Sequence, residues 1–244
     1  MHNPATETFD VALGLPGGGF AGAGHWLSGW GAGSWAGLAD LNNDGKADLV
    51  VGGADGNWSV ALSTGSSFAG LGIELTGWSP GDWTGLADVT GDGAADLVVH
   101  NPATNTYDVA VNDGHGHFGA PGTGAWLTGW GAGTWAGLAD LNGDGKADLL
   151  VTGTDNNWSE ATSTGSSFAG VGNVLTGWSH GDWSGLADVT GDGAADIVVH
   201  NPGENGYDVY ANDGHGHFGG AGTGTWLSGW GSSPVTLLAN LDGR

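Results

Sequence analysis

Hydrophobic residues along the chain fall into short runs separated by turns rich in glycine. One set of runs is WTGLADV (83–89), AADLVVHN (94–101), TYDVAVND (106–113) and GAWLTGW (124–130). TYDVAVND alternates apolar and polar residues, which is the period of a β-strand with one buried face. No stretch shows the helical period, and the density of glycine itself disfavours helices. The pattern therefore predicts a protein of short strands joined by turns.

This set of strands recurs along the chain. The segment GLADLNNDGKADLVV returns in similar form, and a shortened copy ends the chain, so that the copies occupy residues 37–51, 85–99, 137–151, 185–199 and 237–244. Their starts are spaced by 48, 52, 48 and 52 residues, so a repeat of 100 residues overlies one of about 50. Residues 84–118 match 184–218 at 28 of 35 positions, which indicates recent duplication or design.

Four strands in about 50 residues is the size of one blade of a β-propeller. We therefore predict an all-β protein, a single β-propeller domain over residues 1–244 with four-stranded antiparallel blades. Complete units begin near residues 37, 85, 137 and 185, and residues 1–36 supply the later strands of a unit split between the termini, whose first strand begins near 237. Two ways of closing the ring of about five blades remain open: a composite blade formed from both termini, or a homo-oligomer in which copies pair. Kelch and WD repeats have similar lengths, but their diglycine or Gly-His and Trp-Asp signatures are not regular features here.

Composition narrows the choice of partners. The chain has 53 Gly without a G-X-Y period, 14 Trp and no Cys, which describes a folded, turn-rich protein without disulfides. Lys plus Arg number 3 against 26 Asp plus Glu, and the formal charge of −23 repels nucleic acid and anionic membrane surfaces. No long apolar stretch predicts membrane insertion and no signal peptide is visible. Since Met1 leads directly into the middle of a repeat, we expect a processed, excised or engineered segment.

Each complete unit carries an acidic loop, which in the first copy reads DLNNDGKAD at residues 40–48. It begins like an EF-hand, but position 12 is Val51 instead of glutamate, and a strand-like run follows instead of a helix. Asp recurs at positions 1, 5 and 9, an oxygen donor stands at position 3, glycine at position 6 allows a sharp turn, and the carbonyl of position 7 completes the set. Oxygen donors without His or Cys select Ca²⁺ over Zn²⁺. The predicted calcium ligands are Asp40, Asn42, Asp44, Lys46 and Asp48; Asp88, Thr90, Asp92, Ala94 and Asp96; Asp140, Asn142, Asp144, Lys146 and Asp148; and Asp188, Thr190, Asp192, Ala194 and Asp196.

The alternative is a set of acidic turns without metal, because Asp, Asn and Gly dominate turns for conformational reasons. Three carboxylates in each compact loop would repel one another, which favours calcium. Four Ca²⁺ ions would change the formal charge from −23 to −15 (−23 plus 8), and each ion would tie two strands of a blade together. In the fifth copy Asn240 stands at position 1 and Arg244 at position 5, so we predict four sites and not five.

The D-x-[NT]-x-D-G-x-x-D loop between GLAD and ADLVV resembles the FG-GAP/VCBS repeat of integrin α-subunit propellers, bacterial secreted proteins and fungal propeller lectins. NDGHGHF at 112–118 and 212–218 and LSTGSSF at 62–68 resemble other turns of that repeat. The resemblance covers essentially the whole chain and implies calcium in the loop that joins the first two strands of each blade. Relatives usually close with seven blades, whereas this chain encodes about five units.

Tryptophan also recurs at fixed places, for which packing between blades is the general expectation, since glycine-rich blades need large rings to fill a core. The other interpretation is sugar binding, in which a sugar stacks on an exposed ring beside polar groups. The candidate ligand-binding residues are Asp55, Asn57 and Trp58, His100 and Asn101, Asp155, Asn157 and Trp158, and His200 and Asn201. The pairs His115/His117 and His215/His217 would suit a transition metal, but the first copy lacks both, so polar turns are expected.

No unit breaks the repeat with a catalytic constellation, so an enzyme is not predicted. The leading hypothesis is a calcium-stabilised, lectin-like binding module with several glycan sites, because repeated units make repeated weak sites that combine into avidity. A structural or adhesion scaffold for a protein partner, or a non-catalytic accessory domain of a polysaccharide-acting enzyme, are the alternatives. Calcium sites of extracellular modules have Kd of roughly 10⁻⁴–10⁻³ M, which favours a secreted, extracellular protein.

Overall fold

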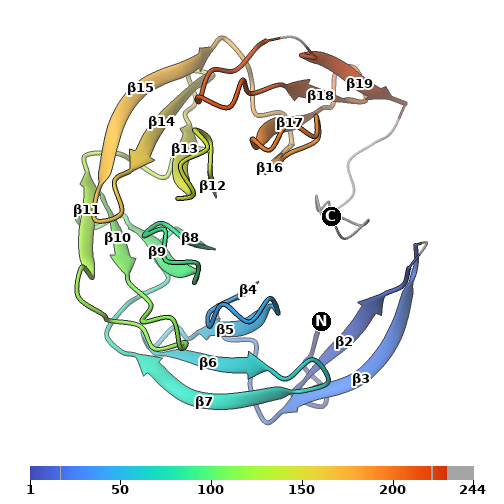
Figure 1. Ribbon diagram of the computed structural model, residues 1–244, viewed down its shortest axis with the longest axis vertical. Helices are drawn as coiled ribbons and strands as arrows, with labels where there is room; N and C mark the ends of the chain where they lie inside the picture. Colours follow the sequence, from blue (N-terminus) through green and yellow to red (C-terminus); the bar gives the residue numbers. More distant parts are fainter. Residues whose placement is uncertain (17, 221, 230–244) are drawn as a thin grey trace.

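The chain forms a five-bladed β-propeller. In this computed structural model, residues 1–16, 18–220 and 222–229 are described, and in them 19 strands form five antiparallel sheets. Figure 1 shows the sheets side by side along an arc, with the first strand of each complete sheet innermost and the last outermost. The all-β propeller predicted from the sequence is confirmed.

Blade 1 has three strands and each other blade has four, in chain order across the sheet. Blade 1 contains β1 (His2–Asn3), β2 (Thr8–Gly14) and β3 (Phe20–Ser28). Blade 2 contains β4 (Trp35–Ala39), β5 (Asp48–Gly52), β6 (Trp58–Ser63) and β7 (Phe68–Leu75). Blade 3 contains β8 (Trp83–Ala87), β9 (Asp96–Asn101), β10 (Thr106–Ala110) and β11 (Gly124–Thr128). Blade 4 contains β12 (Trp135–Ala139), β13 (Asp148–Thr152), β14 (Asn157–Ser163) and β15 (Phe168–Thr176). Blade 5 contains β16 (Trp183–Ala187), β17 (Asp196–Asn201), β18 (Gly206–Tyr210) and β19 (Gly224–Ser228).

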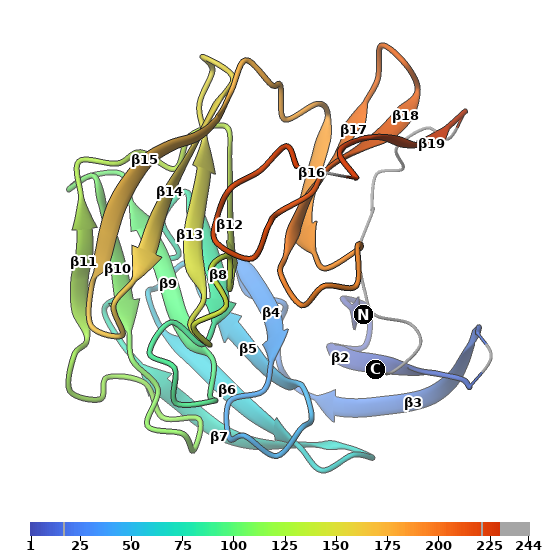
Figure 2. The same ribbon diagram turned by 45° about the horizontal axis from the view of Figure 1, so that its top comes forward.

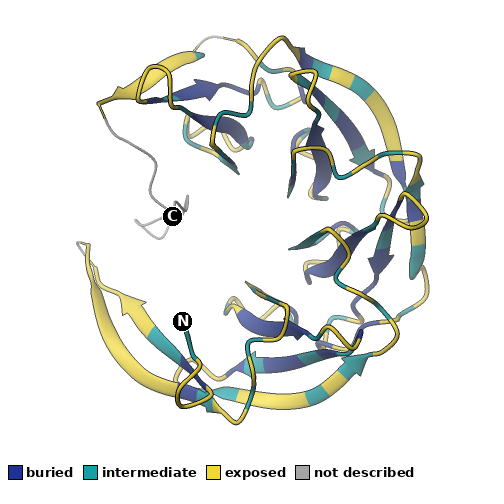
Figure 3. Ribbon diagram, turned by 180° about the vertical axis from the view of Figure 1, so that it is seen from behind, coloured by how far each residue is buried: buried dark blue, intermediate teal, exposed yellow. Residues whose placement is uncertain are grey.

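The hydrophobic core lies between the blades. In β5, Leu49 and Val51 pack with Phe9 of blade 1, whereas Val50 packs with Leu97 of blade 3. Successive side chains of a strand point to opposite faces of its sheet, so a second strand with neighbours on both sides must be apolar throughout. Figure 3 shows the result, in which the second strands are buried and the outer strands are exposed.

Aromatic rings fill these interfaces. Trp58 and Trp158 are completely buried, and their indoles lie 5.6 and 5.4 Å from those of Trp35 and Trp135. The indole NH of Trp83 donates to the carbonyl of Ala136 in the next blade at 3.1 Å. For these residues the expectation of packing is confirmed, because large rings occupy the space that glycine-rich blades leave.

Two glycines show why the turns leading into the blades need this residue. Gly33 and Gly81 have φ of +63° and +65°, which residues with a Cβ rarely adopt. A Cβ at either position would also collide with a backbone carbonyl, that of Gly52 or that of His100. The turn into the innermost strand can therefore lie directly against the end of the second strand.

Figures 1 and 2 show an opening in the arc between the described strands of blade 5 and those of blade 1. Blades 2 to 5 contact one another through their innermost strands, as β4 contacts β8 and β12 contacts β16, whereas blades 1 and 2 contact through β3 and β7. The predicted fifth loop, with Asn240 and Arg244, lies outside the described residues.

Candidate functional site

The acidic loops join the innermost strand of each complete blade to its second strand. The aspartate at position 9 is the first residue of the second strand, and in all four blades it is completely buried: Asp48, Asp96, Asp148 and Asp196. The carboxylate of Asp48 accepts hydrogen bonds from the backbone NH groups of Leu41 (3.0 Å) and Ser63 (2.6 Å). Position 9 thus joins the loop to the third strand of its own blade.

These buried carboxylates are in an unfavourable electrostatic setting. Burial raises the pKa of Asp96 to about 6, and the nearby charge of Asp92 adds to the effect. Burial likewise raises the pKa of Asp148 to about 6, with contributions from Asp144 and Asp140. Because a neighbouring cation favours the charged form of a carboxylate, a metal ion in the loop would reverse this shift.

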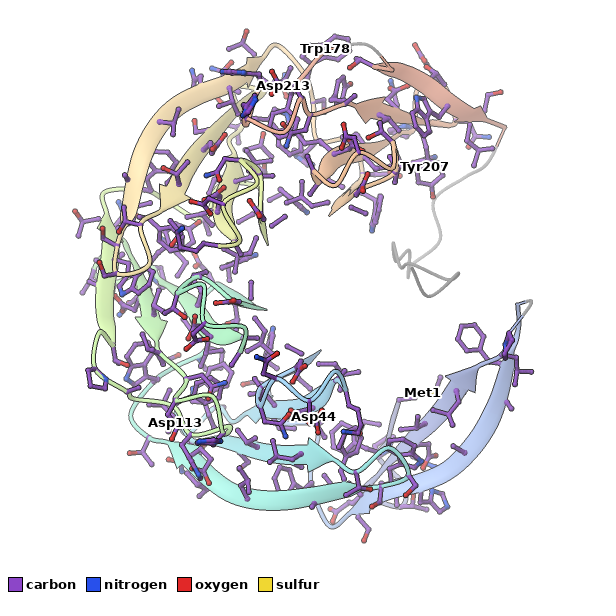
Figure 4. All side chains as sticks on the ribbon, in the orientation of Figure 1. Met1, Asp44, Asp113, Trp178, Tyr207 and Asp213 are labelled. Atoms are coloured by element: carbon purple, nitrogen blue, oxygen red, sulfur yellow. The ribbon has the colours of Figure 1, made fainter. Side chains whose placement is uncertain are left out.

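The position 1 carboxylates organise the loop backbone. Asp40 accepts the NH of Gly45 at 2.7 Å, and Asp88 accepts the NH of Gly93 at 2.8 Å. Gly45 and Gly93 have φ of +79° and +94°, so the sharp turn expected at position 6 is present. Figure 4 shows Asp44, at position 5, on the inner side of the ring.

The donor chemistry fits calcium, although the side chains do not surround a common point. Within the described residues, no three acidic or histidine side chains are grouped as ligands of one ion. Instead the carboxylates bond to backbone NH groups, and Asp44 pairs with Lys46 at 2.5 Å. Three carboxylates, one of them fully buried, and glycine at the turn are nevertheless the donor set that a hard cation requires.

The loops of neighbouring blades are linked by hydrogen bonds. Asn112 of blade 3 donates its side-chain NH₂ to the carbonyls of Leu41 in blade 2 (2.7 Å) and Ala95 (3.1 Å). In blade 4 the hydroxyl of Ser163 donates to the carbonyl of Val89 in blade 3 at 2.5 Å. Asn212 of blade 5 donates to the carbonyl of Leu141 in blade 4 at 2.9 Å, so Asn and Ser perform the same task in alternate blades, and the acidic loops of blades 2, 3 and 4 are each supported by the next blade.

Pockets of a second kind lie at the junctions between blades. The pocket between blades 1 and 2 has a volume of about 370 Å³ and is lined by Trp30, Asp55, Asn57 and Ser59. The corresponding pocket between blades 2 and 3 measures about 590 Å³, and the one between blades 4 and 5 about 240 Å³. These two share a tryptophan, a serine, an asparagine and an aspartate, which are Trp78, Ser79, Asn101 and Asp108 in one and Trp178, Ser179, Asn201 and Asp208 in the other. Figure 4 shows Trp178 near the rim of the ring.

Several of the predicted ligand-binding residues lie in these pockets. Asp55 and Asn57 line the first, with the amide of Asn57 donating to Asp55 at 2.8 Å, and Asn101 and Asn201 line the other two. Asp155 and Asn157 are paired in the same way in blade 4, also at 2.8 Å.

Trp58 and Trp158 require a correction. Both rings are completely buried, so neither presents the exposed face that sugar stacking was expected to use. Their indole NH groups donate to the carbonyls of Trp78 and Trp178 at 2.7 and 2.9 Å, which holds the adjoining Gly-Trp turn in place. The tryptophans that line the pockets come from the Gly-Trp pair that ends each blade, a recurrence visible in the sequence.

His100 and His200 are also buried inside the blades. The ring nitrogens of His100 face Asp82 at 2.5 Å and the carbonyl of Trp130 at 3.0 Å, so the ring connects the first, second and last strands of blade 3. His200 pairs with Asp182 at 2.5 Å. Both imidazoles are buried and paired with an aspartate of their own blade, whereas the asparagines that follow them, Asn101 and Asn201, line the pockets.

The His-x-His turns do not form metal centres in the part of the chain that is described. His117 pairs with Glu74 of the preceding blade at 2.6 Å, and His217 pairs with Asp213 in its own turn at 3.0 Å. The two copies thus use different partners, which agrees with polar turns.

Fold and site together define a propeller of repeated blades with acidic loops and inter-blade pockets. The chain matches the FG-GAP-like repeat over residues 40–99, 88–151 and 140–199, and it belongs to that family. Comparison with curated protein sequences finds no match. No helix among the described residues is long and apolar enough to span a bilayer.

Two solved structures are similar to this fold. A lectin of Agrocybe aegerita, described as specifically recognising non-reducing terminal N-acetylglucosamine, shares 27% identity with a TM-score of 0.72. The match covers 96% of this chain and 65% of the lectin, so the chain spans somewhat less than two thirds of the lectin's length. The Tc holotoxin pore of Photorhabdus luminescens matches with a TM-score of 0.57 at 18% identity, over 96% of this chain and 11% of the toxin chain, and shows the fold alone.

Proposed function

We propose that this protein is a calcium-stabilised β-propeller that binds carbohydrate at equivalent sites between its blades. The observation that carries the proposal is the recurrence of a similar pocket at three of the four blade junctions, each combining a tryptophan with amide and carboxylate side chains. Sugars have apolar ring faces and hydroxyl edges. An indole can pack against the apolar face of a sugar ring, and Asn or Asp can hydrogen-bond its hydroxyl groups, so each pocket offers both kinds of contact.

The similar lectin suggests which sugar to test first. Because the Agrocybe lectin recognises terminal N-acetylglucosamine and shares 27% identity with this chain, a terminal N-acetylhexosamine is the proposed ligand. Volumes of about 240–590 Å³ suit one or two sugar units more than a long chain. Several weak sites on one ring would act together on a glycan-coated surface, which raises avidity without new contacts. Binding without turnover is proposed.

Calcium would have a structural role. The side chains at loop positions 1, 3, 5 and 9 and the carbonyl at position 7 would hold the ion, which would supply positive charge to a loop with three carboxylates. The loop joins the two inner strands of its blade, and its carbonyls accept hydrogen bonds from the next blade. An extracellular location, where calcium is millimolar, is part of the same proposal.

A glycan array followed by calorimetry tests the proposal. We expect binding of glycans with terminal N-acetylglucosamine and, in Trp78→Ala and Asn101→Ala, the loss of one binding site per chain, because each change alters only the pocket between blades 2 and 3. His115→Ala, on an exposed turn of the same blade outside that pocket, is the control and should bind with the full number of sites. An unchanged number of sites in both pocket variants would place the site elsewhere, and the absence of glycan binding in a chain that binds four calcium ions would reject the carbohydrate part of the proposal alone.

A further inference from the structure

The junctions between blades are of two alternating kinds. Where an odd blade precedes an even one, a tryptophan of its last strand packs edge-on against a phenylalanine of the LSTGSSF or TSTGSSF turn. Trp26 contacts Phe68 in this way with ring centroids 5.4 Å apart, and Trp126 contacts Phe168 at 5.5 Å. Odd and even blades therefore present different surfaces to their neighbours.

Where an even blade precedes an odd one, the NDGHGHF turn supplies the contact. Phe118 of blade 3 is buried against the apolar cluster of blade 2, beside Val60 and Leu62. Phe218 of blade 5 packs against the cluster of blade 4 with Trp158 and Leu175. In the described part of the chain, odd blades pack only against even ones.

Among the described residues, the two faces beside the opening lack these partners. Trp226 of blade 5 is 50% exposed, whereas its equivalent Trp126 is 6% exposed. Phe20 of blade 1 is 71% exposed, whereas its equivalent Phe118 is 8% exposed. On the face of blade 5, Trp226 has no phenylalanine from a following even blade against it. On the face of blade 1, Phe20 has no apolar cluster of a preceding even blade to pack against.

The inner side of blade 1 carries an apolar pocket. This pocket of about 250 Å³ is lined by Phe9, Leu38, Leu49 and Phe68, and Leu38 is 61% exposed. The equivalent Leu138 lies against Gly85 on the innermost strand of the preceding blade. In blade 1 the corresponding innermost strand would lie in this pocket, beside the two-residue strand β1.

We propose that the opening is a docking surface for one further blade of the even kind, continued by the two inner strands of blade 1. An even blade is the occupant that covers both faces, since its phenylalanine would meet Trp226 and its apolar cluster would bury Phe20. Direct contact of blade 5 with blade 1 would instead bring two odd faces together, a junction that occurs at none of the four interfaces described. The proposal does not depend on the sugar or calcium assignments.

Hydroxyl-radical footprinting of two extended chains tests this proposal. One replaces residues 230–244 by the sequence of residues 130–199, which contains the four strands of an even blade and the two inner strands of an odd one. Its matched control has residues 78–151 in that place, which contain the four strands of an odd blade and the two inner strands of an even one. In the 244-residue chain we expect Trp226 and Phe20 to be oxidised faster than Trp126 and Phe118, roughly in proportion to their exposure. The even extension should slow both to the rates of their equivalents and raise the melting temperature, and the odd extension should do neither.

Three results would overturn the proposal. They are slow oxidation of Trp226 and Phe20 in the monomeric 244-residue chain, slow oxidation only as concentration produces dimers, and equal protection by both extensions. A second measurement remains informative if the extended chains do not fold. Phe20→Ser should leave the melting temperature of the 244-residue chain unchanged while Phe118→Ser lowers it, and an equal loss in both would show that Phe20 is already covered.

Discussion

The backbone NH of Ala95 in blade 3 donates a hydrogen bond of 2.9 Å to the carbonyl of Asp40, the first residue of the acidic loop in blade 2. Ala147 of blade 4 makes the same bond to Asp88 of blade 3 at 2.7 Å. The acidic loops of blades 2, 3 and 4 are therefore linked in series through their backbones.

Calcium removal should destabilise the whole ring. At free calcium about 100-fold above Kd, each bound ion contributes about 2.7 kcal/mol to the free energy of unfolding. We expect EDTA to lower the melting temperature and calorimetry to count four ions per chain. Asp92→Asn should remove one ion, whereas Asp113→Asn, on an exposed turn, should remove none. A full count of ions in Asp92→Asn would show that the loop of blade 3 is not a site.

The link through Asn112 should contribute strongly to stability. In Asn112→Ala the carbonyls of Leu41 and Ala95 lose a buried donor, and each unsatisfied group costs about 1–3 kcal/mol. We expect urea unfolding to show a loss in that range or above. Asn112→Ser should recover part of this stability, because Ser163 of blade 4 makes the equivalent bond to Val89 of blade 3. Equal losses in the two variants would assign the effect to packing alone.

Trp58 should matter for stability and not for direct sugar contact. Its ring is completely buried, so Trp58→Ala should lower the free energy of unfolding by about 3–5 kcal/mol, the usual cost of such a truncation. Trp58→Phe keeps much of the volume and should fold with a smaller loss and retain sugar binding. Failure of a stably folded Trp58→Phe to bind sugar would return this ring to the list of ligand contacts.

Glu160 should make stability depend on pH. It stands where blade 2 has Val60, it is 2% exposed, and burial raises its pKa to about 7. Asp148 reinforces the rise and His217 opposes it. The folded state keeps the proton that the unfolded chain releases near its ordinary pKa of 4.5, so the free energy of unfolding falls as the pH rises from about 4.5 to about 7.

At 1.36 kcal/mol per pH unit, this loss amounts to at most about 3 kcal/mol. Glu160→Gln should therefore be more stable than the unmodified chain at pH 8, and the two should converge near pH 4, as measured by urea unfolding at fixed calcium. Glu204→Gln, on an exposed turn, should show no such difference. A parallel pH profile for Glu160→Gln and the unmodified chain would contradict the prediction.

The sequence predicts the blades well because their signals are local. Period-two runs such as residues 106–113 fall on real strands, and Gly45 marks a turn that requires positive φ. The tryptophans available for stacking against a sugar were harder to predict, because adjacent residues of a strand face opposite sides of the sheet. In β14, Asn157 and Ser159 are partly exposed, but Trp158 between them points into the core.

The pockets could not be found from one unit because each is shared between two. Trp30 ends blade 1, yet its pocket partners Asp55 and Asn57 belong to blade 2. The recurring Gly-Trp pair was a usable signal, but only the placement of one blade beside the next shows what it contacts. The same holds for Glu160, whose burial depends on blade 5.

The alternation of the two kinds of junction has a consequence for how such rings arise. If Trp126 must meet Phe168 and Phe118 must meet an even cluster, duplicating a single blade creates a junction of like with like. Copying two adjacent blades together leaves every junction matched. The gene should therefore lengthen or shorten in steps of about 100 residues, and the near identity of 84–118 with 184–218 is what one recent step of that size would leave behind.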